Sequence, residues 1–413
     1  MKPFFFRLAT LSLRFSIPLV ILTYLTTDEL GKYYLFTVTA TTIIFFISLE
    51  IGIPSSKKYL RSWHHHLQQS VFSSLLYTQM KLGFLFAIPV MLVFGVYLHL
   101  SIAMGVVCIL YLVTEACVNE SGRFFWNIGE VSTASSRDFF RALFFAISLG
   151  AGVYAEEKAI SVTALGLLSF FNTLIILQEQ VKWGHRLTFK CVQLHNVSRT
   201  LKKNMLRTYR MVYSAVPQTA HLQVLGLQPL LERWFIERSV SLEMVGLYSF
   251  QFSLVQAGFS LLLLPFIADL RRAILSTTAM KNKEKVFQKA RVFALRCLSV
   301  GLLCAVGAYI SLPLLNIILS KNLEAHVGIA VVVWLSASSL VFTGAVSPLY
   351  APKERIFTAN IFTLLAMAPL AAGMVYSTIY GSMPQMVVFV TLAASAILQM
   401  LVRSSFFLKK THE

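Results

Sequence analysis

The chain has 413 residues, of which 56% are hydrophobic and only 13% are charged, and its formal net charge is +18. A soluble domain carries about 25% charged residues, so the composition excludes an ordinary soluble protein. The basic residues fall in several separated loops rather than in one patch, which argues against nucleic acid as a partner.

The apolar residues form long runs instead of alternating with polar ones. Because about 20 apolar residues cross the hydrocarbon core as a helix, the runs predict an all-α, polytopic membrane protein with about 12 transmembrane helices. The expected helices are Phe4–Leu25, Tyr34–Ile53, Thr78–Leu98, Ser101–Val118, Phe139–Tyr154, Ala159–Leu177, Met211–Leu231, Val245–Ala268, Val292–Leu319, Val327–Tyr350, Ile356–Thr378 and Pro384–Val402. Proline inside four of these runs predicts kinks, at Pro217, Pro265, Pro313 and Pro369.

The lysine and arginine residues predict the orientation. With the N-terminus in the cytoplasm, 31 of the 36 fall on the cytoplasmic side and 5 on the outer side. By the positive-inside rule both termini are therefore cytoplasmic. The basic segments 182–210 and 281–285 are expected to lie against anionic lipid head groups.

A repeat relates the two halves of the chain. A shift of 215 residues places Asp28 on Glu243, Gly31 on Gly246 and Tyr33 on Tyr248. A repeat of this length predicts two similar halves: a six-helix lobe at 1–181, a basic cytoplasmic linker at 182–210 and a second six-helix lobe at 211–413. Both polar stretches are expected to be turns on the outer face, which the glycines would allow.

No catalytic signature is present: the sequence has no P-loop, no GxSxG and no HExxH. The outer loops are short, so neither an enzyme nor a cofactor is expected. The adjacent histidines 64–66 point in different directions on a helix and do not converge on a metal. The five cysteines lack CxxC spacing and are expected to be small buried hydrophobes.

Polar residues deep in apolar runs are costly and mark candidate functional positions. Arg7 and Arg14 are seven residues apart on the first expected helix and share one face. Arg7 has an alternative role at the cytoplasmic surface, which its long side chain can reach. Arg14 lies near the middle of its run and is expected to face a cavity.

Further polar candidates lie on the helices expected at 211–231 and 245–268: Gln218, His221, Gln228, Gln251 and Gln256. The last two have the alternative of hydrogen bonding to neighbouring helices. Among the acidic residues, Glu115 and then Glu50 are the candidates for ion coupling. Glu120 is expected to pair with Arg123.

Several motifs resemble those of one known family. They are 25–33, 49–53 and 57–59 in the first half, and 232–236, 245–249 and 264–266 in the second. In their order and duplication they resemble the polysaccharide flippases of the multidrug/oligosaccharidyl-lipid/polysaccharide (MOP) exporter superfamily. Glu232 stands where that family usually has Asp.

The resemblance implies a V-shaped, MATE-like pair of six-helix bundles in which helices 1, 2, 7 and 8 line a central cavity. It implies alternating-access translocation of an undecaprenyl-pyrophosphate-linked oligosaccharide, such as an O-antigen or capsule repeat unit, across the bacterial inner membrane. Such flippases serve lipopolysaccharide and other polysaccharide biosynthesis, so the polysaccharide polymerase and chain-length machinery are expected partners, along with membrane lipids.

On this hypothesis Arg14, Arg7 and His221 bind the pyrophosphate, because arginine pairs with phosphate oxygens bidentately. The glutamines at 218, 228, 251 and 256 donate hydrogen bonds to sugars, and a proton or sodium gradient supplies the energy. Two alternatives stay open: a cation-coupled drug exporter of the same superfamily, and a non-transporting membrane enzyme or scaffold of polysaccharide assembly.

Overall fold

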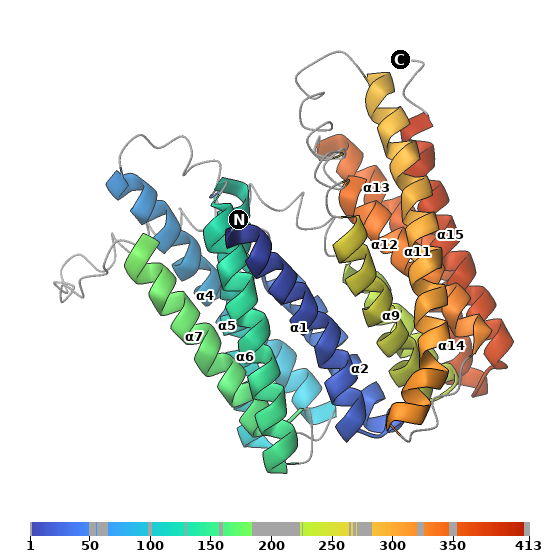
Figure 1. Ribbon diagram of the computed structural model, residues 1–413, viewed down its shortest axis with the longest axis horizontal. Coiled ribbons are helices and arrows are strands. Elements are labelled where there is room, and N and C mark those ends of the chain that lie inside the picture. The colour runs from blue at the N-terminus through green and yellow to red at the C-terminus, as the bar shows by residue number, and fades with distance from the viewer. Residues whose placement is uncertain are drawn as a thin grey trace. The chain divides into compact units, whose positions relative to one another are not determined.

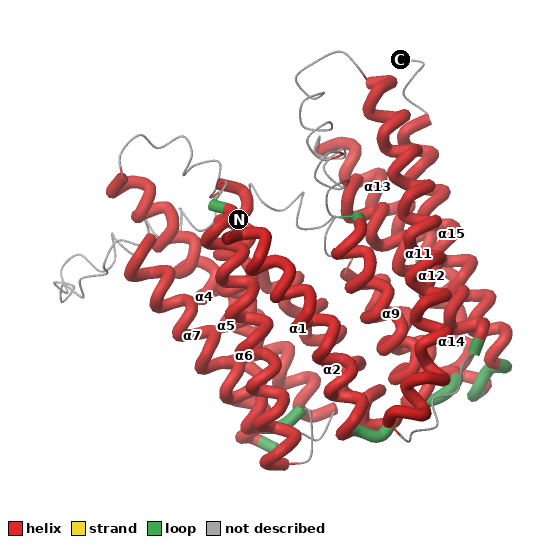
Figure 2. The backbone as a smooth tube through the Cα atoms, viewed as in Figure 1, coloured by secondary structure: helices red, strands yellow, loops and turns green. Residues whose placement is uncertain are grey.

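The computed structural model describes residues 2–48, 65–97, 101–128, 130–156, 160–183, 226–263, 283–319, 326–346 and 353–408, together with a few single positions between them. Within these ranges the regular secondary structure is entirely helical (Figure 2). The expected all-α class is therefore confirmed.

The first half of the chain contains α1 (Lys2–Tyr24), α2 (Thr27–Ser48), α4 (His65–Tyr97), α5 (Ile102–Ile128), α6 (Val131–Glu156) and α7 (Val162–Trp183). The second half contains a helix at 226–239, followed by α9 (Leu242–Leu262), α11 (Lys283–Leu319), α12 (Val327–Val346), α13 (Lys353–Ala366), α14 (Ala368–Tyr380) and α15 (Gln385–Leu408).

Seven of the described helices are long and apolar enough to cross a membrane, and the number is eight if α13 and α14 form one bent span. The chain is therefore a multi-pass membrane protein. The bend between α13 and α14 is 43°. It lies beside Pro369, which occupies the first turn of α14, so the kink expected there is confirmed.

Helix α2 begins at Thr27, seven residues before Tyr34, where the sequence predicted its start. Thr26 and Glu29 form a capping box: the backbone amide of Thr26 donates to Glu29 Oε2 at 3.0 Å, and the amide of Glu29 donates to Thr26 Oγ1 at 3.3 Å. These bonds satisfy amides that a helix start leaves free. The polar stretch that was expected to be a turn is thus the first two turns of a helix.

Charged residues at the expected cytoplasmic ends are also helical. The sequence predicted helices that end at Val118 and begin at Phe139, but α5 continues to Ile128 and α6 begins at Val131. Arg123 pairs with Glu120 at 2.8 Å, as expected. The pairing of opposite charges between turns makes a helical conformation favourable in spite of the polarity.

The helices group into two compact units. The first unit comprises residues 1–13 and 40–219, and the second comprises 14–39 and 220–413. Helices α1 and α2 are each shared between the units. The lobes expected at 1–181 and 211–413 stay a prediction.

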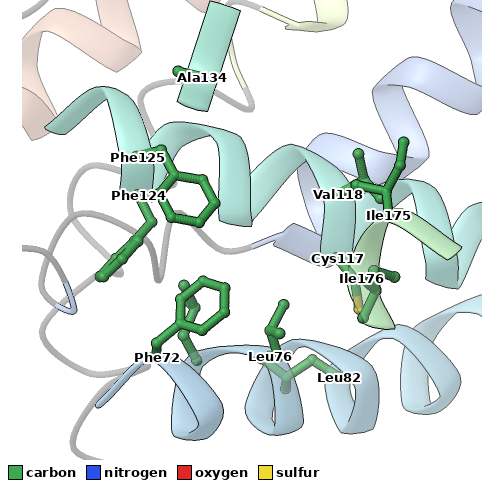
Figure 3. Packing of buried hydrophobic residues seen from close by; sticks show 11 residues of the cluster. Phe72, Leu76, Leu82, Cys117, Val118, Phe124, Phe125, Ala134, Ile175 and Ile176 are labelled. Atoms are coloured by element: carbon green, nitrogen blue, oxygen red, sulfur yellow. The ribbon is translucent and has the colours of Figure 1, made fainter. Parts of the chain in front are cut away.

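In the first unit, α4, α5, α6 and α7 lie side by side (Figure 1). Their shared core contains Phe72 from α4, Phe124 and Phe125 from α5, and Ile175 from α7, all buried (Figure 3). The Phe72 ring lies 5.2 Å from that of Phe124 and 5.5 Å from that of Phe125, centroid to centroid. These contacts hold the polar residues of α5, α6 and α7 in a fixed register.

In the second unit, α9 packs against α11 and α12, and α12 packs against α15 (Figure 1). Phe250 and Phe259 of α9 are fully buried, as is Phe235 of the preceding helix. Tyr248 has the largest of the side chains that are less than 2% exposed. Its burial brings a hydroxyl group into the apolar interior, and the partner of that hydroxyl leads to the polar cluster described below.

Candidate functional site

The residues predicted to bind substrate or to couple an ion are distributed over both described and undescribed parts of the chain. Glu50, Gln218 and His221 lie outside the described residues. The backbone of Arg7 and Arg14 belongs to α1, and their side chains lie outside the described part. Helix α1 is continuous from Lys2 to Tyr24, so Arg14 stands close to its midpoint.

A buried carboxylate lies in the second unit at Glu232, which is 1% exposed. The hydroxyl of Tyr248 on α9 donates to Glu232 Oε2 at 2.7 Å, and the side-chain amide of Gln228 donates to Glu232 Oε1 at 2.8 Å. Both of these donors are neutral. The Glu232 carboxylate is therefore stabilised by neutral hydrogen-bond donors. The buried carboxylates of the first unit instead form ion pairs with arginines.

Arg233, the next residue, is also buried, at 5% exposure. Its Nε donates to Ser249 Oγ at 2.9 Å and its Nη1 donates to the carbonyl of Pro229 at 2.9 Å. The guanidinium carbon lies 5.5 Å from the ring centroid of Tyr248 and 5.0 Å from that of Phe252. Contacts with aromatic faces stabilise a cation that has left water.

The polar residues at 228–233 were therefore only partly predicted. Gln228 was expected on a helix, but Glu232 and Arg233 were assigned to the outer side because the expected helix ended at Leu231. The helix continues to residue 239 and carries both charges inward. The signal that was overlooked is the four-residue spacing of Gln228 and Glu232, which places them on one helix face.

Gln251 and Gln256 occupy different environments on α9. Gln251 is 1% exposed, and neither its side-chain oxygen nor its side-chain nitrogen has a hydrogen-bonding partner among the described residues. Gln256 is half-buried. Buried amides are nearly always hydrogen-bonded, so the unsatisfied groups of Gln251 mark a polar position within the second unit.

Glu115 belongs to a charged cluster in the first unit. One carboxylate oxygen forms an ion pair with Arg141 of α6, and the other accepts a 2.9 Å hydrogen bond from Asn172 of α7. The three residues lie on three helices, each well inside its span. Glu115 was predicted from its depth alone, and the structure adds both of its partners.

The same cluster continues toward the expected cytoplasmic ends of these helices. Arg137 of α6 lies 2.9 Å from Glu179 of α7, Nε to Oε1, and it also contacts the carbonyl of Val118. A Cβ atom on Gly122 would collide with the Arg137 guanidinium, so a larger residue at this point of α5 would require Arg137 to move. The arrangement joins α5, α6 and α7 through paired charges, which are costly to separate once they are buried.

Within the described residues, no group of three or more His, Cys, Asp or Glu side chains is arranged to hold a metal ion. The four described cysteines are free, and three of them, Cys108, Cys117 and Cys297, are buried. The polar clusters described above can bind dipoles and single charges, and neither of them pairs a nucleophile with a base.

Solved structures of membrane transporters match this chain over nearly its whole length. An inward-facing multidrug resistance MATE family transporter of the MOP superfamily matches with a TM-score of 0.57 and 15% identity, covering 97% of this chain and 95% of that one. The chain has the fold of the MATE transporters.

Two further MATE structures agree. The multidrug transporter DinF-BH, solved as a complex with a ligand, has a TM-score of 0.58 at 11% identity and covers 99% of this chain and 94% of its own. An outward-facing MATE family transporter has a TM-score of 0.52 at 13% identity, with 99% and 95% covered. No family model matches the sequence. No curated protein matches it either. At these identities the likeness to MATE transporters concerns the fold.

Proposed function

We propose that this protein is a flippase that moves an undecaprenyl-pyrophosphate-linked oligosaccharide across the bacterial inner membrane by alternating access. The proposal joins the MATE fold to the polysaccharide-flippase motifs of the sequence. In this account the lipid tail stays in the bilayer while the charged headgroup crosses through the protein. Both termini are cytoplasmic, and the polysaccharide polymerase and chain-length machinery act on the product.

The observation that carries the proposal is the position of Arg14 at the middle of one continuous helix, α1. A guanidinium at the centre of the bilayer costs roughly 2.5–3.5 kcal/mol even on lenient scales, so a binding role is needed to offset it. A pyrophosphate provides that role because arginine binds phosphate oxygens through two parallel hydrogen bonds. Arg7 and His221 are the further cationic candidates.

The sugar is the second part of the substrate, and glutamine side chains suit it. Gln228 and Gln251 are buried in the second unit, and Gln218 and Gln256 are neighbouring candidates on the same two chain segments. Amides both donate and accept hydrogen bonds, so they match the hydroxyl groups of an oligosaccharide without selecting for charge.

We assign energy coupling to a carboxylate within the membrane. Glu115 and Glu50 are the candidates from the sequence, and Glu232 joins them because its hydrogen-bond donors, Tyr248 and Gln228, are neutral. A carboxylate held by neutral donors can take up a proton or a sodium ion with a large change in local electrostatics. Transport by Glu232→Gln that no longer responds to pH or sodium would support this assignment.

A bacterial strain that lacks its own flippase tests the proposal in cells. Arg14→Ala is expected to lower surface polysaccharide by about tenfold, the effect of losing ~1.4 kcal/mol of binding. Arg14→Lys keeps the charge but loses the bidentate contact, so an intermediate level is expected. Arg238→Ala, an exposed arginine at the end of the helix 226–239, is the matched control. Full complementation by both Arg14 variants would overturn the assignment of Arg14.

The second candidate function is cation-coupled drug export. The observation in its favour is the buried carboxylate of Glu232, since a cationic drug needs an acidic site. The two functions differ in the charge of the substrate. An accumulated lipid-linked intermediate in the deletion strain, together with unchanged sensitivity to cationic dyes, would support the flippase.

A further inference from the structure

Gly31 on α2 and Gly246 on α9 make a reciprocal contact. A Cβ atom on Gly31 would collide with the backbone carbonyl of Leu242, and one on Gly246 would lie 2.5 Å from the carbonyl of Thr27. Leu242 is the first residue of α9, and Thr27 is the first residue of α2. Each glycine therefore faces the first residue of the other helix.

The repeat relates the two halves of this contact to each other. The shift of 215 residues that relates the two halves carries Thr27 onto Leu242 and Gly31 onto Gly246. The pair Gly31–Leu242 thus becomes the pair Gly246–Thr27. This is the signature of a two-fold contact, in which residue i meets j and the equivalent of i meets the equivalent of j. We call these four residues the glycine crossing.

The helix starts that form the glycine crossing are built in the same way. Ser241 caps α9 by accepting a hydrogen bond from the amide of Met244 at 3.2 Å. Thr26 is its equivalent under the same shift, and it caps α2 through Glu29. Because equivalent caps fix the starts of α2 and α9, each glycine lies four residues after the first residue of its helix.

Polar contacts accompany the glycine crossing. Thr27 Oγ1 donates to Glu243 Oε1 at 2.9 Å, and both residues are at least partly exposed. Farther along α2, Trp234 Nε1 donates to Thr39 Oγ1 at 3.4 Å. Small residues let two backbones approach closely in a membrane, and weak CH···O contacts with carbonyls add to the packing. Such a contact holds two helix backbones close together.

The glycine crossing is one of the contacts between residues 14–39 and the rest of the second unit. These residues are the later part of α1, the turn and the earlier part of α2, and they group with 220–413 rather than with the rest of the first repeat. Tyr33 and Tyr34 of this segment are buried, at 6% and 8% exposure. In the expected orientation, this junction lies at the outer face of the membrane.

We propose that the glycine crossing is the outer seal of the transport cycle: it closes the two repeats against each other at the outer face and separates to release substrate. This inference rests on the proposed function. A two-fold contact can open by moving both repeats equally, and at the two glycines the contact is made by backbone atoms.

A reversible cross-link tests the seal in the full-length protein. Thr27→Cys combined with Glu243→Cys, oxidised with copper phenanthroline, is expected to form a disulfide that mass spectrometry detects between the two peptides. The cross-link should abolish translocation of a lipid-linked oligosaccharide in vesicles, and reduction should restore it. Thr26→Cys combined with Glu29→Cys is the matched control, because its disulfide lies within one helix start and leaves the repeats free.

The possible outcomes distinguish failure of the proposed seal from failure of the proposed function. Cross-linked protein that transports at the rate of the control pair would overturn the seal and leave the flippase proposal intact. If unmodified protein moves no lipid-linked oligosaccharide, the proposed function fails, and spin labels at positions 27 and 243 in nanodiscs then decide the seal. Two resolved distance populations would support its opening, whereas a single short one would overturn it.

Discussion

Tyr248 on α9 donates a 2.7 Å hydrogen bond to the buried carboxylate of Glu232 on the preceding helix. Replacement by phenylalanine keeps the aromatic packing and removes only this donor. We expect Tyr248→Phe to lower the free energy of unfolding by about 1–3 kcal/mol, because a buried carboxylate is left with one donor fewer. Denaturant titration in detergent measures the change. Tyr24→Phe, at a position that is 69% exposed, is the control, and equal effects of the two substitutions would contradict the role of the bond.

The ion pair between Glu115 and Arg141 predicts a strong coupling of the two residues. The pair is half-buried, so breaking it from one side should cost less than the ~3–5 kcal/mol of a fully buried pair. We therefore expect Glu115→Gln and Arg141→Met each to be destabilising, and the double variant to be less destabilised than the sum. A double-mutant cycle on the free energy of unfolding measures the coupling. Additive effects would mean that the pair does not act as a unit.

Gly122 predicts a steric effect that differs from ordinary helix propensity. Alanine normally stabilises a helix interior by about 0.5–1 kcal/mol relative to glycine. At Gly122 the new Cβ would displace Arg137 from Glu179, so Gly122→Ala is expected to be destabilising. Gly105→Ala is the control in the same helix, because nothing lies within 4 Å of its Cβ. Thermal unfolding should give shifts of opposite sign, and a stabilising Gly122→Ala would refute this packing.

The cap of α9 predicts a local effect at the start of this helix. Ser241→Ala removes the oxygen that accepts from the amide of Met244, which should cost about 1 kcal/mol. Ser241→Thr keeps the oxygen and should be nearly neutral. Hydrogen exchange of the first turn of α9 measures the loss directly, and unchanged protection in Ser241→Ala would count against the cap.

The helices were predictable because apolar runs of membrane length have few other solutions. The ends of these helices were not predictable in the same way, because polar residues at a helix end were assigned to loops. The stretch at Thr27–Tyr34 shows why: its charges belong to helix turns, as the Thr26–Glu29 capping box in the sequence already indicated. Its glycines were expected to allow a turn, and this was wrong. Gly31 and Gly246 lie within helices, where they allow close approach instead.

The polar clusters were harder to predict, because they depend on helix register. Glu115 stands out by its depth in an apolar run, but its partner Asn172 lies 57 residues away, and only packed helices bring the two together. Glu232 and Arg233 were missed because one helix was ended too early. The roles of Arg7 and Arg14 follow from the sequence alone and stay predictions.

The central claim is that an anionic lipid-linked sugar is the substrate. Purified protein in vesicles, with a fluorescent undecaprenyl-pyrophosphate oligosaccharide in the membrane, measures translocation as a loss of accessibility to an outside quencher. The account predicts translocation that depends on the protein, that falls in Arg14→Ala, and that a cationic dye does not compete with. Transport of the cationic dye without movement of the lipid-linked sugar would contradict it.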